Sequence, residues 1–158
     1  FETQDQIAYY HEFEKEKVIY SEIVREPQFH YDTERFYVEA TGFLMTGRNI
    51  KYICGLLNSF TVTFVFRKYY AGGGLGQEGY RYKKAFLENL PIPPITEHNE
   101  PLVKQIESLV DKITSIKKDN PQEDTTTYER EIDQLVYKLY ELTDEEIEII
   151  ESSKLVSK

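Results

Sequence analysis

The sequence contains no tryptophan, only one cysteine and no long hydrophobic run. Because Cys54 alone cannot form an internal disulfide, the pattern is typical of an intracellular protein, and we expect a cytoplasmic one. No apolar stretch reaches the roughly 18 residues of a membrane-spanning helix, so no membrane association is expected. No charged-then-apolar signal segment opens the chain. The first residue is Phe1 rather than Met, and we therefore expect a piece of a longer protein.

Aromatic side chains, in contrast, are abundant: 13 Tyr and 9 Phe among 158 residues. Disordered chains are poor in aromatic residues, so this composition predicts a folded protein. The length is that of one ordinary domain, which is long enough to bury a hydrophobic core.

The net charge of −9 is divided unevenly along the chain. Residues 1–41 carry a net charge of −6 and residues 96–158 a net charge of −8, whereas residues 42–95 carry +5. All eight glycines also lie between Gly42 and Gly79. Since local potential rather than total charge attracts a polyanion, the central third is the part that suits nucleic acid.

Strand signals dominate the first part of the chain. Residues 17–25 are rich in β-branched and aromatic side chains and predict a strand that ends before Pro27. Residues 29–31 and 35–41 predict the two pairing segments of a hairpin, and residues 43–45 predict a third short strand.

Helical signals follow. The apolar spacing predicts a helix over residues 49–57. Residues 60–70 are ambiguous, because their threonines and valines favour a strand whereas Ser59 is a good helix cap; we favour a helix. Helices are also predicted over residues 102–118 and 127–140.

Thr143 and Glu146 have the spacing of a capping box, which predicts a last short helix through Ile150. The expected organisation is therefore α+β (mixed α/β). A body of residues 1–95 would be followed by a helical part, residues 96–158, that packs on it within a single domain.

Residues 67–94, RKYYAGGGLGQEGYRYKKAFLENLPIPP, form the most distinctive segment. Cations and tyrosines flank a glycine loop on both sides. Backbone amides, guanidinium groups, ammonium groups and phenol rings together suit a polyanion that carries bases. A solvated surface loop is the plainer interpretation, and we expect at least two of the four tyrosines to pack in the protein: Tyr69, Tyr70, Tyr80 and Tyr82.

No catalytic constellation is visible. Residues 74–79 match the pattern GxGxxG, but the acidic residue and second strand of a dinucleotide site do not follow, and the chain is instead interrupted at Pro91. His11, His30 and His98 lie far apart in the sequence, so no metal site is predicted.

Four segments, in this order, resemble a known family: VIYSEIVREPQFHYD, TGFLMTGRNIKYICGLLNS, FVFRKYYAGGGLGQEGYRYKKAFLENLPIP and IDQLVYKLYELTDEEIEIIE. Over residues 17–151 the chain resembles the C-terminal specificity (target-recognition) domain of TaqI-like adenine-specific DNA methyltransferases. Such domains also end fused type IIG restriction–modification enzymes, in which an endonuclease is attached.

The resemblance implies a curved β-sheet with flanking helices, followed by two or three C-terminal helices. It implies sequence-specific recognition of double-stranded DNA in support of adenine-N6 methylation. The Asn-Pro-Pro-Tyr type motif of the methyltransferase core is absent from this chain, as is its cofactor loop. Catalysis and S-adenosylmethionine are therefore expected in a methyltransferase domain that is missing here, and this chain is expected not to be an enzyme.

Under this resemblance, the chemistry of the side chains suggests roles for individual residues. Lys68, Lys83 and Lys84, with amides of the glycine loop, would contact phosphates. Arg67 or Arg81 would read a guanine edge, because a guanidinium forms bidentate hydrogen bonds. The acidic helices, residues 101–119 and 127–150, would face away from DNA. The full candidate set is Arg25, Arg35, Arg67, Lys68, Tyr70, Gly73, Gly74, Arg81, Tyr82, Lys83 and Lys84.

Two alternatives stay open at this point. The paired helices would bind a protein partner if the chain is a protein-interaction module with an incidental basic loop. The glycine loop would bind a nucleotide if the chain is a complete enzyme.

Overall fold

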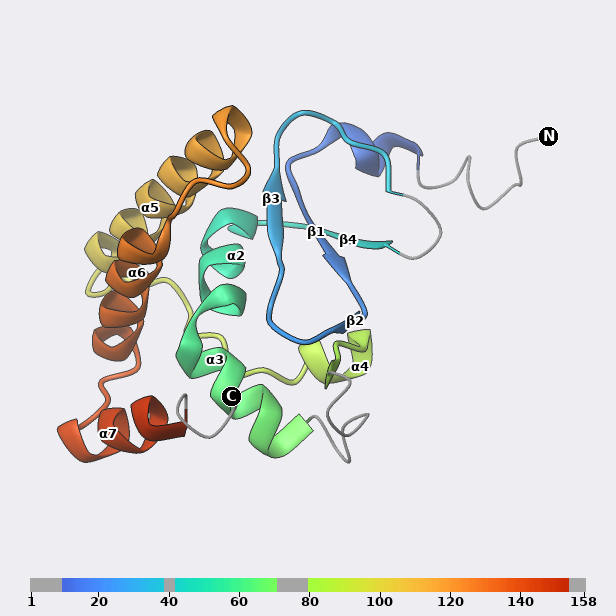
Figure 1. Ribbon diagram of the computed structural model, residues 1–158. Helices are drawn as coiled ribbons and strands as arrows, with labels where there is room; N and C mark the ends of the chain where they lie inside the picture. The colour runs from blue at the N-terminus through green and yellow to red at the C-terminus, as the bar shows by residue number, and fades with distance from the viewer. Residues whose placement is uncertain (1–9, 39–41, 71–79, 154–158) are drawn as a thin grey trace.

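The computed structural model describes residues 10–38, 42–70 and 80–153. Short antiparallel strands lie between residues 17 and 81 and long helices dominate from residue 100, so the predicted α+β class is confirmed. The strands lie on one side of helix α2, and helices α5 and α6 lie on its other side (Figure 1). The elements are η1 (Tyr10–Glu14), β1 (Lys17–Ser21), β2 (Ile23–Val24), β3 (His30–Asp32), β4 (Gly42–Thr46), α2 (Ile50–Asn58), α3 (Phe60–Val65), η2 (Phe66–Tyr70), β5 (Tyr80–Arg81), α4 (Lys84–Leu87), α5 (Glu100–Asp119), α6 (Thr126–Leu139) and α7 (Asp144–Ser153).

The main sheet has β1 at its centre, with β3 and β4 antiparallel on its two sides. Val18 pairs with Tyr31 of β3 and with Met45 of β4. Val18 and Tyr20 are buried and so face the core, as the two-residue period of a strand requires. The predicted strand over residues 17–25 is confirmed, with an interruption at Glu22 that separates β1 from β2.

The prediction of a pairing strand over residues 35–41 is wrong for the described part, residues 35–38. Strand β3 pairs with β1 instead, and β4 pairs with β1 on its other side. The carboxylate of Asp32 accepts hydrogen bonds from the backbone N–H groups of Glu34 (2.8 Å) and Phe36 (3.1 Å), which folds the chain locally after β3. Sequence propensity alone did not reveal this side-chain cap.

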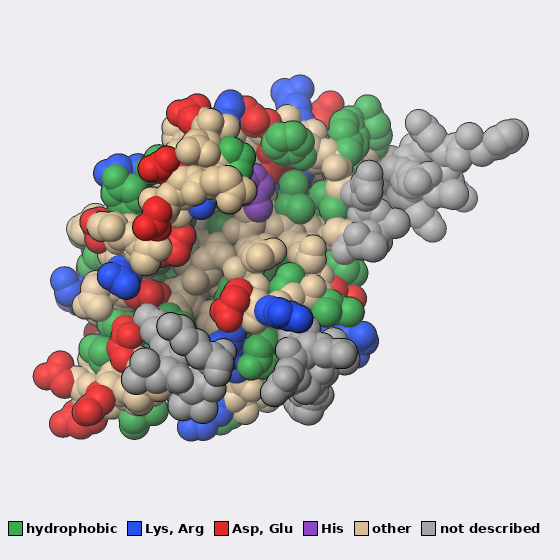
Figure 2. Space-filling model, viewed as in Figure 1, with side chains coloured by type: hydrophobic (Ala, Val, Ile, Leu, Met, Phe, Trp, Pro, Cys, Tyr) green, Lys and Arg blue, Asp and Glu red, His purple; other side chains and the backbone are tan. Residues whose placement is uncertain are grey.

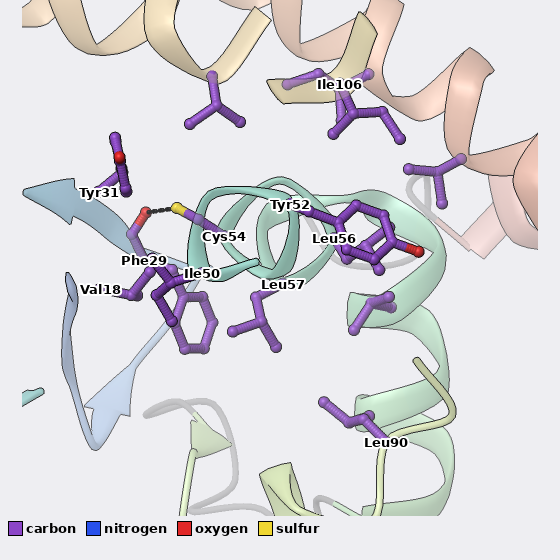
Figure 3. Packing of buried hydrophobic residues seen from close by; sticks show 14 of the residues in the cluster. Val18, Phe29, Tyr31, Ile50, Tyr52, Cys54, Leu56, Leu57, Leu90 and Ile106 are labelled. Atoms are coloured by element: carbon purple, nitrogen blue, oxygen red, sulfur yellow. Dashed lines mark hydrogen bonds between the residues drawn. The ribbon is translucent and has the colours of Figure 1, made fainter. Parts of the chain in front are cut away.

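Helix α2 carries the centre of the core (Figure 3). Ile50 and Leu57 lie near Val18 and Phe29 on the strand side, whereas Ile106 of α5 lies on the opposite side of the helix. Cys54 is buried, as predicted, and its Sγ lies 3.3 Å from the backbone oxygen of Phe29. Burial raises the pKa of this thiol to about 12, so it stays protonated at neutral pH.

Ser59 ends α2 and begins α3. Its hydroxyl oxygen accepts a hydrogen bond from the backbone N–H of Val62, at 3.4 Å. The helix predicted over residues 60–70 is confirmed, and its last five residues form the π-helical turn η2. This turn places Arg67 at the edge of the strands.

Three helices form the C-terminal part of the described chain, and the predictions over residues 102–118 and 127–140 are confirmed as α5 and α6. The predicted capping box is also present. Thr143 donates its backbone N–H to Glu146 Oε2 (2.9 Å), and Glu146 donates its backbone N–H to Thr143 Oγ1 (3.3 Å). In residues 10–38, 42–70 and 80–153, no helix is both long and apolar enough to cross a membrane.

Candidate functional site

A two-stranded ribbon, formed by β2 and β5, lies beside the main sheet. Val24 pairs with Tyr80 and Ile23 with Arg81, and the N–H of Tyr82 donates to the carbonyl of Glu22 at 2.7 Å. The ring of Tyr82 stacks on Phe66 of η2 with 4.2 Å between ring centroids. The ribbon is thereby attached to the π-helical turn and to the core.

Arg67 lies where η2 meets the ribbon. Its Nη2 is 2.9 Å from Glu26 Oε2 and donates to the carbonyl of Arg25 at 3.2 Å. Its guanidinium lies over the ring of Tyr80, 4.6 Å from the centroid. The side chain is only 15% exposed, so Arg67 is held in one place rather than free in solvent.

Arg81 occupies the neighbouring position on β5. Its Nε lies 3.4 Å from Glu22 Oε1, across the ribbon, and its side chain is 44% exposed. Arg25, which follows β2, is exposed as well. Three arginines therefore surround one short ribbon.

Lysines lie on the neighbouring elements α4 and η2, although Lys68 also lines a pocket with Glu146 and Ile149 of α7. Lys83 immediately precedes α4 and Lys84 begins it, and both side chains are exposed. The ammonium group of Lys84 lies 3.6 Å from the carboxylate of Glu88, one turn further along the chain. Lys68 of η2 lies over the rings of Phe64 and Tyr69, at 5.4 and 5.8 Å from their centroids.

We call these six side chains the cationic surface: Arg25, Arg67, Lys68, Arg81, Lys83 and Lys84. The elements that carry them gather at the lower right of Figure 1, away from α5 and α6 at the left. In Figure 2, red carboxylate side chains cluster over α7 at the lower left, whereas blue side chains lie over the region of β2 and α4. The carboxylates that pair with Arg67 and Arg81 are those of Glu26 and Glu22, which flank β2 of the ribbon and do not belong to the acidic helices.

Two of the predicted residues have packing roles. Tyr82 is 3% exposed and burial raises its pKa to about 12, so its ring is covered and its hydroxyl stays protonated. Tyr70 is half-buried, and its hydroxyl donates to the carbonyl of Asn89 at 2.9 Å. The expectation that at least two of the four tyrosines pack in the protein is confirmed.

Another predicted residue, Arg35, does not join the surface. Arg35 is exposed but lies beyond the far end of β3, where the neighbouring Glu34 pairs with Lys118 of α5. It has a φ of 64°, in the left-handed region. Gly73 and Gly74, with the GxGxxG pattern, lie outside the described residues.

Two residues that form ion pairs with these arginines, Glu22 and Glu26, were not predicted from the sequence. Glu26 and Arg67 lie 41 residues apart in the chain, and only the packing of η2 beside the ribbon brings them together. In the sequence, their carboxylates are indistinguishable from the many solvated acidic groups of the chain.

One family model, the TaqI-like C-terminal specificity domain, matches residues 2–92. No curated protein matches the chain. The matched range contains the main sheet, α2, η2, the ribbon and α4, and therefore the whole cationic surface. The resemblance of the C-terminal segment, up to residue 151, lies outside this range.

A match of this extent, over more than half of the sequence, assigns the family. The chain belongs to the TaqI-like C-terminal specificity domains, which gives it a role in DNA recognition within restriction–modification systems.

Proposed function

We propose that this chain reads a specific sequence of double-stranded DNA as the specificity domain of an adenine-N6 DNA methyltransferase. One observation carries the proposal: the arginines and lysines at β2, η2, β5 and α4 lie on elements around one short ribbon (Figure 1), in a protein whose net charge is −9. A local positive potential attracts phosphates even when the total charge is negative.

The exposure and the chemistry of these side chains suggest different roles for the lysines and the arginines of the cationic surface. Lys68, Lys83 and Lys84 are exposed ammonium groups on flexible stems, which suits contacts with phosphates. Arg81 has a 44% exposed guanidinium beside the ribbon, which suits a bidentate hydrogen bond to a base edge. Arg67 has its Nη2 occupied and its Nε buried, so it would contact a base through Nη1. Phosphate contacts from the amides of Gly73 and Gly74 stay a prediction.

The methylation chemistry belongs, in this proposal, to a methyltransferase domain of the parent protein. That domain would bind S-adenosylmethionine, and this chain would supply no catalytic group. The acidic helices α5 and α6, on the side away from the cationic surface, would face that domain or solvent. The parent protein should transfer a labelled methyl group from S-adenosylmethionine to adenine in duplex DNA; absence of an Asn-Pro-Pro-Tyr type motif from the parent sequence would contradict this part.

Fluorescence anisotropy with labelled duplex DNA tests the DNA contact. Binding should weaken steeply between about 50 and 200 mM salt, because each neutralised phosphate releases about 0.9 counterions. A triple variant with Lys68, Lys83 and Lys84 changed to Ala should bind more weakly. The slope of its salt dependence should also be shallower, by about 0.9 for each phosphate that the variant no longer neutralises.

The matched control replaces three exposed lysines of the acidic helices with Ala: Lys104, Lys112 and Lys138. It makes the same change in net charge on the other side of the molecule, and its affinity should stay close to that of the unmodified chain. Equal weakening in both triple variants would contradict the assignment to the cationic surface.

The alternatives predict different results in the same assay. A protein-interaction module would show no salt-dependent binding of duplex DNA. A nucleotide-dependent enzyme that uses the glycine loop would give a heat of nucleotide binding in calorimetry.

A further inference from the structure

The guanidinium of Arg67 is confined on several sides. Glu26 and the carbonyl of Arg25 hold Nη2 at 2.9 and 3.2 Å, and the ring of Tyr80 covers one face. The Nε atom is buried and has no hydrogen-bond partner among the described residues. A group confined in this way cannot swing toward a phosphate, so its donors keep one plane.

Arg81 is oriented by a carboxylate that flanks β2, as Arg67 is. Glu22 precedes β2 and Glu26 lies just beyond it, so the two carboxylates flank the strand that pairs with β5. Glu22 lies 3.4 Å from Nε of Arg81, while Glu26 holds Arg67. A carboxylate on either side of this two-residue strand thus faces one arginine, with a hydrogen bond to Arg67 and a longer ion-pair contact to Arg81.

The lysines of the surface are held differently. The ion pair of Lys84 joins it to Glu88 within its own helical turn, at 3.6 Å. Glu88 is 62% exposed and Glu26 is 66% exposed, so the two carboxylates are matched in charge and exposure. They differ in that Glu26 orients a guanidinium whereas Glu88 faces a flexible ammonium group.

Resting on the function proposed above, we propose that Glu26 and Glu22 are positioning residues that determine sequence specificity. They fix the planes of Arg67 and Arg81 for hydrogen bonds to base edges. Their negative charge also opposes the approach of phosphates to these arginines, which limits binding to unrelated sequences. The carboxylates therefore raise discrimination while they lower total affinity for DNA.

The test uses the 158-residue chain and a pool of duplexes with a randomised central stretch. Sequencing of the bound fraction gives the preferred sequence, and anisotropy gives the ratio of dissociation constants for a scrambled and a preferred duplex. In Glu26→Gln, affinity for the scrambled duplex should rise several-fold and this ratio should fall several-fold, because Arg67 would contact a base through Nη1 alone.

Glu88→Gln is the control, because it removes the same charge from the same end of the molecule. It should raise affinity for both duplexes alike and leave the ratio within about twofold of the original. Arg67→Lys keeps the cation but loses the planar fork, so the ratio should fall while the salt dependence stays unchanged. A merely structural role for Glu26 would lower the thermal unfolding midpoint without changing the preferred sequence.

Several outcomes would overturn the inference. The inference fails if the ratio of dissociation constants is the same in Glu26→Gln and in Glu88→Gln. It also fails if Arg67→Lys keeps the ratio of the unmodified chain. The Arg67→Lys result decides the question if Glu26→Gln does not fold. If the unmodified chain binds duplex DNA without any preferred sequence, the inference fails although DNA binding stands. If it binds no duplex at all, the proposed function itself fails.

Discussion

Buried tyrosine hydroxyls behave differently according to whether they have a partner. Tyr82 and Tyr52 are both at most 3% exposed. The hydroxyl of Tyr52 donates to the carbonyl of Pro93 at 3.0 Å, whereas that of Tyr82 has no hydrogen-bond partner among the described residues. A buried polar group without a partner costs about 1–3 kcal/mol, so Tyr82 contributes through its ring.

We therefore expect Tyr82→Phe to leave the free energy of unfolding unchanged or to raise it by about 1 kcal/mol. The ring stacking on Phe66 is kept and the unpaired hydroxyl is removed. Tyr52→Phe should instead lower the free energy of unfolding by about 1 kcal/mol, because it leaves a carbonyl unpaired. Urea titration measures both, and a larger loss in Tyr82→Phe than in Tyr52→Phe would show that the Tyr82 hydroxyl has a partner.

At the scale of the elements, the close packing of α2 on α5 depends on Gly55. A Cβ atom at this position would lie 2.6 Å from Cγ2 of Ile106 and 3.2 Å from Cγ2 of Val110. The first distance is too short for two carbon atoms, and Ile106 is fully buried and cannot move into solvent.

Gly55→Ala should therefore lower the free energy of unfolding by about 1–2 kcal/mol, as overpacking does, although alanine is the better helix former by about 1 kcal/mol. Denaturant titration of the double variant is the control. In an Ile106→Ala background the added methyl group has space, and Gly55→Ala should no longer destabilise. Equal destabilisation in both backgrounds would place the cause elsewhere than in this contact.

A second stabilising feature at this scale is the buried ion pair between Lys17 of β1 and Asp32 of β3. The two groups are 2.5 Å apart and at most 1% exposed, and Lys17 also donates to the carbonyl of Phe13 at 2.8 Å. Burial by itself raises the pKa of Asp32, but the hydrogen bond and charge of Lys17 and the two backbone N–H groups outweigh it, so the pKa is lowered overall.

The carboxyl group of Asp32 has a lower pKa in the folded protein than in the unfolded chain, where the pKa is about 4. Its ionised form therefore stabilises the folded protein at pH values above about 4. This stability should be lost as the pH falls through the lower, folded value. In Asp32→Asn that part of the acid dependence should disappear. At pH 7 the same variant should lose about 3–5 kcal/mol, because Lys17 remains buried without its counter-ion. Guanidinium titrations at several pH values measure both effects; an unchanged acid dependence would contradict this role.

The whole molecule depends on helices outside the matched range of the family. Helix α5 packs against α2 and supplies the buried side chains of Val103 and Ile106 to the same core that the strands use. We therefore propose that residues 1–95 and 96–158 are two parts of one domain, as the sequence suggests.

A chain that ends after Ile95 should not fold cooperatively, because one face of α2 would be exposed to water. Far-UV circular dichroism and a urea titration of this shorter chain provide the test. A cooperative transition with the midpoint of the full chain would show that the first part is a domain by itself.

Much of the fold was predictable because its signals are local. The apolar spacing of α2, α5 and α6, the Ser59 cap and the box of Thr143 and Glu146 each act within a few residues. The strand prediction over residues 35–38 was wrong because local propensity does not describe the interactions that form there. There the side chain of Asp32 accepts hydrogen bonds from the backbone, and β3 pairs with β1 rather than with residues 35–38.

The residue types of the candidate site were predictable from the sequence, whereas the contacts among them were not. The sequence by itself determined that the cations and tyrosines of one segment stand out in an acidic chain, since composition and charge order are properties of the chain alone. Only the tertiary structure decided which of them meet: it buried Tyr82, left Arg35 at the far end of β3 and set Glu26 against Arg67. The physical reason is that strand pairing and helix packing bring together residues far apart in the chain, and no local pattern carries that information.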